Sequence, residues 1–247
     1  MKIKALWVAV FLFLPLTAGA QNADEIIAKV IAARGGLDKI HAVTSQRITG
    51  QISLGGTTTG PFQVELKRSL KMHMQLTIQN LTMVRVYDGT NGWANNPFAG
   101  KPNPEAMEDE ELKNISEESD FDGPLVDYKA KGNEIELVGK DKVEGKDVWR
   151  LKLTTKNAAV RYYLFDANTF LLLKWEGKRA GDGQEVPVES FFRDYRDVGG
   201  LKFAFEIDSG APGSEITQKL TIDKIELNPK LDDSEFVKPA APAASAQ

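Results

Sequence analysis

The side chains in this sequence that could take part in acid-base chemistry are mainly carboxylates. Asp120 and Asp122 form one close pair, and a hydrolase of the glycosidase type could use such a pair as acid and base. Asp194 and Asp197 form a second pair. Each pair also has a structural explanation. An Asp near a turn forms hydrogen bonds with its own backbone, and charges that alternate in sign along a strand form ion pairs with residues of the neighbouring strand.

Other reactive groups are scarce. The 247 residues include 0 Cys and 2 His, which excludes thiolate chemistry, disulfides and zinc sites built on Cys or on three His. His41 follows a glycine-terminated helix and His73 falls on the polar side of a predicted strand. Neither lies in a catalytic motif such as HExxH or GxSxG. We therefore expect no catalytic residue, no metal ion and no cofactor, and we expect the chain not to be an enzyme.

Methionine, in contrast, is clustered. Every methionine beyond residue 20 lies between residues 72 and 107. Its flexible, polarizable side chain suits surfaces that accommodate ligands of varying shape, although filling gaps in a core is its commoner use. We predict that these methionines and their apolar neighbours line an apolar ligand-binding cavity. The predicted lining residues are Met72, Met74, Leu76, Met83, Trp93, Met107 and Leu112.

Strands must position these residues. Apolar and polar side chains alternate along successive runs between residues 43 and 227, and turn sequences such as Asp88-Gly89 separate the runs. The pattern predicts a mainly β fold with a few helices (α+β), in which about 10 or 11 strands with short links form a single curved antiparallel sheet. A sheet of that size curls, so side chains, helices or a ligand must fill its concave face.

Two segments are predicted helices that could cover this face. Asn22 caps the first helix and Gly35 ends it. The second lies near residues 102–120, is acidic and weakly apolar, and has Pro104 at its expected start. We interpret it as a helical lid over the mouth of the sheet, and the alternative is a solvated surface excursion.

Both ends of the chain are expected to lie outside the folded domain. Residues 1–20 combine early lysines, an apolar run and a small-residue cleavage pattern, as in a secretory signal peptide. No Cys follows that run, so we expect a soluble, non-lipidated protein, exported to the periplasm as a monomer. Residues 238–247 carry no large apolar side chain and are expected to form a disordered tail, which leaves residues 21–237 as one domain.

Three segments resemble a known family. The run YDGTNGWANNPF (residues 87–98) resembles the DG, W and NP pattern of periplasmic carriers in the outer-membrane lipoprotein-sorting superfamily, the LolA-like proteins. Residues 33–53 and 191–205 resemble more distant secreted relatives. The resemblance implies an unclosed half-barrel with helices on its concave face, enclosing an apolar cavity for acyl chains. It also implies a functional arginine, for which Arg47 and Arg85 are the two candidates.

The sequence thus favours a binding protein. We expect a carrier or chaperone that shelters a lipid, an acyl chain or a lipoprotein during envelope trafficking, with inner- and outer-membrane envelope proteins as further partners. A net charge of -4 offers no basic surplus for nucleic acid. The alternatives are a periplasmic carbohydrate-acting hydrolase that uses paired carboxylates, and a non-catalytic envelope adaptor whose own side chains fill the cavity.

Overall fold

The computed structural model describes residues 22–181 and 184–240. The predicted signal peptide and the predicted tail from residue 241 onward lie outside this range. The described residues contain 13 strands in a single antiparallel sheet, somewhat more than the sequence predicts. The strands are β1 (Ser45–Leu54), β2 (Thr58–Lys67), β3 (Lys71–Ile78), β4 (Leu81–Tyr87), β5 (Gly92–Asn96), β6 (Lys101–Ala106), β7 (Glu134–Val143), β8 (Lys146–Thr154), β9 (Val160–Asp166), β10 (Leu172–Gly181), β11 (Gln184–Val198), β12 (Leu201–Gly210) and β13 (Ile216–Leu227).

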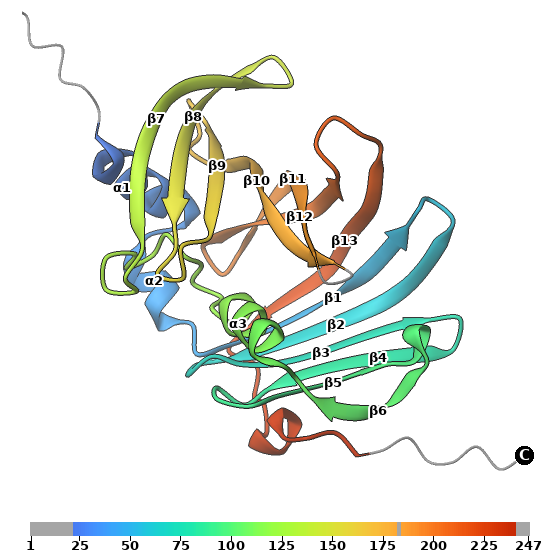
Figure 1. Cartoon of the computed structure of the whole chain (residues 1–247). Coiled ribbons are helices and arrows are strands. Elements are labelled where there is room, and N and C mark those ends of the chain that lie inside the picture. The colour runs from blue at the N-terminus through green and yellow to red at the C-terminus, as the bar shows by residue number, and fades with distance from the viewer. Residues whose placement is uncertain (1–21, 182–183, 241–247) are drawn as a thin grey trace, which may run out of the picture.

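The sheet is an unclosed half-barrel. Its strand order is β6-β5-β4-β3-β2-β1-β13-β12-β11-β10-β9-β8-β7, so β6 and β7 are the two edges and β1 and β13 meet in the middle. Figure 1 shows the sheet curving so that β3 to β5 and β8 to β10 form the two sides of its concave face. The predicted fold class is therefore confirmed. The curvature of the sheet brings side chains from both halves of the chain close together.

The helices are α1 (Ala23–Arg34), α2 (Leu37–Ala42) and α3 (Asp109–Glu118), with short 3-10 helices η1 (Pro97–Ala99) and η2 (Asp233–Phe236). Helix α1 begins as the sequence predicts, because the Asn22 side chain accepts a hydrogen bond from the Glu25 backbone N–H. It ends at Gly35, whose φ of 125° favours glycine.

The segment before α3 differs from the prediction. Residues 101–106 form the edge strand β6, so Pro104 does not start a helix. An edge strand tolerates proline because one row of its backbone N–H groups has no partner strand. Helix α3 instead begins after Glu108, which forms a reciprocal capping box with Glu111. Only the second half of the predicted helical insert is helical.

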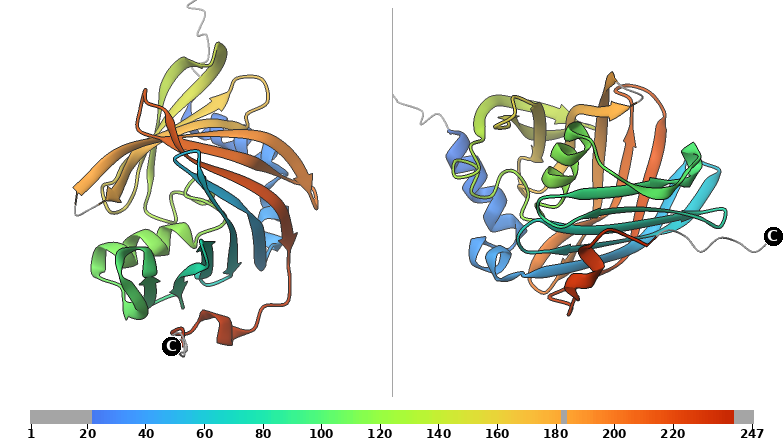
Figure 2. Two further views of the ribbon diagram at one scale, coloured as in Figure 1. Left: turned by 90° about the vertical axis from the view of Figure 1, so that its right-hand side faces the viewer. Right: turned by 60° about the horizontal axis from the view of Figure 1, so that its bottom comes forward.

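Helices α1 and α3 both pack on the concave face of the sheet. Buried Ile26 and Val30 of α1 belong to one apolar cluster with Leu151 and Phe165 of β8 and β9. Ile115 of α3 is 0% exposed and packs in a cluster with residues of β2, β3 and β4. Figure 2 shows α3 crossing the open side of the half-barrel. A further apolar cluster, which includes residues of β1 and β13, lies between the cluster at α1 and the cluster at α3. The concave face is therefore apolar along most of its length.

The chain after β13 returns to the convex face. Leu231 and Phe236 are 6% and 1% exposed, so this segment is anchored by apolar burial. Its 3-10 turn η2 lies against β3, on the side of the sheet opposite α3 (Figure 2). Lys67 and Lys71 both reach the Asp233 carboxylate, with Nζ–Oδ1 distances of 2.9 Å.

Candidate functional site

Most of the predicted cavity residues share the concave face. Met72, Met74 and Leu76 alternate onto that face of β3. Met83 faces Leu76 across the β3–β4 ladder and therefore lies on the same face. Met72 and Leu76 are 4% and 6% exposed, whereas Met74 and Met83 remain partly exposed. The partly exposed pair is thus available to a ligand.

The other two predicted residues near the lid lie at α3. Met107 is 7% exposed and precedes the helix, and Leu112 is a partly buried residue of its first half. Both pack in one cluster with Met72 and Ile115. The residues at α3 therefore share one apolar cluster with Met72 and Met74 of β3.

The sequence prediction assigns Trp93 to the wrong face of the sheet. It is the register partner of Val86 on β4, whereas Gly92 is the partner of Tyr87 and holds the concave position. A Cβ added to Gly92 would lie 2.6 Å from the Met107 Sδ atom, so any larger residue would displace the Met107 side chain. Trp93 consequently lies on the convex face and is no part of a concave cavity.

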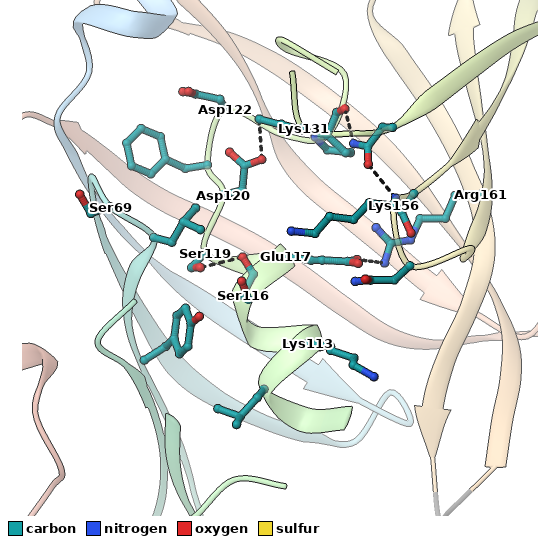
Figure 3. Close-up of a pocket in the computed structure, with 18 of the residues that line it drawn as sticks. Ser69, Lys113, Ser116, Glu117, Ser119, Asp120, Asp122, Lys131, Lys156 and Arg161 are labelled. Atoms are coloured by element: carbon teal, nitrogen blue, oxygen red, sulfur yellow. Dashed lines mark hydrogen bonds and ion pairs between the residues drawn. The ribbon is translucent and has the colours of Figure 1, made fainter. Parts of the chain in front are cut away.

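Two pockets flank α3. The first, the loop-side pocket, has a volume of about 640 Å³ and lies between α3, the β2–β3 turn and the segment that follows the helix (Figure 3). The second, the sheet-side pocket, has about 540 Å³ and lies between α3 and the strands β4, β5, β9 and β10. Both volumes fall within the range of about 300–1,000 Å³ that small-molecule sites occupy. The sheet-side pocket is lined in part by Met83, Arg85, Ala94, Glu117, Arg161, Tyr163 and Trp175.

Ion pairs join the end of α3 to both walls of the half-barrel. Glu118 contacts Arg85 of β4 at 2.6 Å, and Glu117 contacts Arg161 of β9 at 2.5 Å. The last turn of α3 carries no basic residue, so these glutamates lie at the negative end of the helix dipole. The arginines supply the compensating charge from the sheet. Separating α3 from the walls would leave both carboxylates uncompensated, which favours the docked position.

Arg161 is central to this arrangement because it lines both pockets. Burial disfavours its charge, but the neighbouring Tyr163 and Glu117 outweigh that effect and raise its pKa. Burial also raises the pKa of the Tyr163 hydroxyl. The guanidinium therefore remains a permanent cation inside the hollow.

Of the two candidate functional arginines, only Arg85 faces the hollow. Arg85 is the register partner of Met74 and shares its concave face. Arg47 is the partner of Glu65 on the convex face and donates to its carboxylate at 2.6 Å.

The first carboxylate pair gives no support to the hydrolase alternative. Asp122 is buried and accepts a two-pronged ion pair from Arg68. Asp120 is bound by Lys131 at an Nζ–Oδ2 distance of 2.5 Å (Figure 3). Each carboxylate thus has a cation of its own and anchors the segment that follows α3.

The second pair is equally engaged. Asp194 contacts Arg196 at 2.5 Å, and Asp197 accepts the Gly200 backbone N–H at 2.9 Å. That hydrogen bond lowers the pKa of Asp197, while a general acid needs a raised pKa. The pair is a turn-stabilising and charge-pairing feature.

Sequence reasoning missed the residues contributed by the second half of the chain. Tyr163 and Trp175 are register partners on β9 and β10, and both line the sheet-side pocket with Arg161. Their alternation identified strands, but nothing in the local sequence says that these strands face β4. Among the described residues, a group of potential metal ligands (Glu65, His73 and Glu235) was also missed, and it lies on the convex face, away from both pockets.

No helix in the described part of the chain is long and apolar enough to span a bilayer.

Comparison with known proteins identifies the fold. No protein-family model and no curated protein matches the chain. A LolA superfamily protein from Nitrosomonas europaea is similar in structure, with a TM-score of 0.58, 14% identity, and coverage of 89% of this chain and 99% of that one. A DUF1329 family protein from Desulfovibrio piger gives a TM-score of 0.58 at 13% identity, covering 87% of this chain and 96% of that one.

A third similar structure is a putative outer membrane lipoprotein-sorting protein domain from Vibrio parahaemolyticus. Its TM-score is 0.55 at 12% identity, and the match covers 86% of this chain and 94% of that one. At such identities the likeness concerns the fold alone. The predicted structural resemblance to the lipoprotein-sorting superfamily is therefore confirmed for the fold.

Proposed function

We propose that this protein is an exported carrier that binds an acyl chain, from a lipid or a lipid-modified protein, on its concave face beneath α3. The observation that carries the proposal is the sheet-side pocket itself. Partly exposed apolar side chains of β4 and β10, among them Met83 and Trp175, line a hollow of about 540 Å³ under a helix. The fold shared with lipoprotein-sorting proteins supports the same ligand class.

Apolar burial alone can supply the affinity. If an acyl ligand buried roughly 400 Å² of apolar surface, the transfer free energy would be roughly 10 kcal/mol before the costs of association. Such a ligand requires no precisely placed hydrogen-bond donors. Met74 and Met83, which are flexible and partly exposed, suit chains of varying length.

Helix α3 acts in this proposal as the movable cover. Its apolar contact rests on a few side chains, chiefly Leu112 and Ile115, and its end is held by ion pairs to Arg85 and Arg161. Opening exposes Met72 and frees both guanidinium groups at the rim of the hollow. The freed arginines then bind an anionic head group while the acyl chain lies against the sheet.

The test is to purify the protein from its native compartment and analyse an organic-solvent extract by mass spectrometry. We expect about one acyl-chain lipid, or one lipid-modified polypeptide, per chain. An extract without lipid, together with no binding of an apolar dye, contradicts the proposal. That result would instead favour the adaptor alternative, in which the protein's own side chains fill the hollow.

A further inference from the structure

The convex face carries a cluster of potential ligands that is unrelated to the pockets. Glu65 on β2 and His73 on β3 are register partners, so their side chains project side by side. Glu235 of η2 approaches them from the C-terminal segment. One ligand atom from each of the three residues lies within 4.8 Å of the other two.

The geometry of the cluster leaves one oxygen of Glu65 available. Arg47 donates to Glu65 Oε1 at 2.6 Å, and Glu65 Oε2 faces His73 Nδ1 at 3.5 Å. The side chains of Glu65 and His73 are only 4% and 15% exposed. Tetrahedral zinc with ligand bonds of about 2.05 Å has ligand-to-ligand distances of about 3.3 Å. The 3.5 Å separation of Oε2 and Nδ1 is close to this value.

Glu235 is the member of the cluster that comes from the C-terminal segment. Its Oε2 atom is shielded from solvent and has no hydrogen-bond partner among the described residues. A carboxylate oxygen of Glu235 lies within 4.8 Å of one of Glu65. Two ionised carboxylates cannot hydrogen-bond each other, so the contact needs a shared proton or a bridging cation.

The surrounding charges also favour a cation. Arg47 is shared between Glu65 and Glu226, and Lys224 also contacts Glu226, at 2.6 Å. Of these two cations, Arg47 pairs with the cluster, which holds the two carboxyl groups of Glu65 and Glu235. On the same face, Lys67 and Lys71 are engaged by Asp233 of η2.

Gln75 contacts His73 Nε2 at 3.2 Å, and Nδ1 faces Glu65. Nδ1 would bind the ion in the tautomer that carries the proton on Nε2, with the Gln75 amide oxygen turned to accept it.

We propose that Glu65, His73 and Glu235 form a binding site for a divalent transition-metal ion, which fastens the C-terminal segment to the convex face. Mixed nitrogen and oxygen ligation suits zinc and its neighbours better than calcium or magnesium, which prefer oxygen alone. Three protein ligands leave one position for water. The ion would join β2 and β3 to a segment from the far end of the chain, so binding and local folding are coupled.

The experiment is a calorimetric titration of the tag-free full chain, stripped with chelator, with zinc chloride and separately with calcium chloride at neutral pH. We expect one zinc ion per chain and much weaker calcium binding. The single substitutions Glu235→Gln and His73→Gln should each weaken zinc binding by at least about tenfold. Loss of a group that only hydrogen-bonds to a metal ligand already costs about that much, and loss of a ligand itself should cost no less. Glu206→Gln is the matched control, because Glu206 lies on the same face but pairs with Lys219 rather than with the cluster, and this variant should bind zinc normally.

A second measurement separates the metal from a shared proton. Zinc should slow hydrogen exchange at residues 231–236 in the wild-type chain and have no such effect in Glu235→Gln. Absence of saturable binding, or equal binding by both cluster variants and the wild type, overturns the proposal. So does an exchange rate in this segment that saturating zinc leaves unchanged, since that result means that no metal ion joins Glu65 to Glu235. None of these outcomes depends on whether the concave face binds lipid.

Discussion

Substituting Ile115 by alanine should loosen α3 without unfolding the sheet. Ile115 is 0% exposed and lies between α3 and the strand cluster that contains Leu66 and Met72. The substitution removes three carbons at about 0.8 kcal/mol each, so docking of α3 weakens by about 2.4 kcal/mol, with an added contribution from the cavity left behind. Since 1.4 kcal/mol is a factor of ten, the population with α3 undocked should rise by about 50-fold.

Native-state hydrogen exchange measures this population directly. The backbone amides of α3 should exchange about 50-fold faster in Ile115→Ala, whereas those of β3 should be nearly unchanged. Ile26→Ala is the matched control, because Ile26 is also 0% exposed but packs α1 against β8 and β9. It should accelerate exchange across the sheet. Equal acceleration in α3 and β3 on substitution of Ile115 would refute the interpretation of α3 as a separately opening cover.

Three further substitutions test other contacts. Met74→Asp should abolish uptake of a fluorescent fatty acid, while Gln63→Asp on the opposite face should bind it normally; equal loss in a binding titration would mean that the faces are misassigned. Asp233 has its pKa lowered to about 2 by hydrogen bonds to its two lysine partners. The contribution of Asp233 to holding η2 is therefore present at pH values above 3.8, its ordinary pKa, and is lost as the pH falls toward 2. Protection of the η2 amides, relative to the exchange rate of an unfolded peptide at the same pH, should fall over that window in the wild type but not in Asp233→Asn. Arg68→Ala leaves the buried Asp122 carboxylate unpaired and should lower the free energy of unfolding in urea by about 2 kcal/mol. The loss is smaller than for a fully buried pair because the Arg68 side chain is 37% exposed. An unchanged unfolding midpoint would contradict a stabilising role for this ion pair.

Local patterns were enough to predict the strands and the first helix. Alternation identifies β3 and assigns its methionines to one face, and Asn22 and Gly35 mark the ends of α1. These features depend on neighbours a few residues apart, so the sequence displays them directly.

Features that depend on distant pairing were not predictable. The face of Trp93 is set by its partner Val86, because the five residues of β5 show no clear alternation of their own. Pro104 suggested a helix start, but the edge position of β6 makes proline acceptable there. The contact of Glu117 with Arg161 joins residues 44 positions apart, and no local pattern indicates it.

The central claim is that an acyl chain lies on the concave face beneath α3. The most direct measurement is the line broadening caused by a spin-labelled fatty acid in nuclear magnetic resonance spectra of the protein with labelled methionine methyl and tryptophan indole groups. We predict broadening of the Met74 and Met83 methyl signals and of the Trp175 indole signal, with the Trp93 indole on the convex face unaffected. Sharp signals from both methionines at saturating fatty acid, or selective broadening of Trp93, would contradict the account.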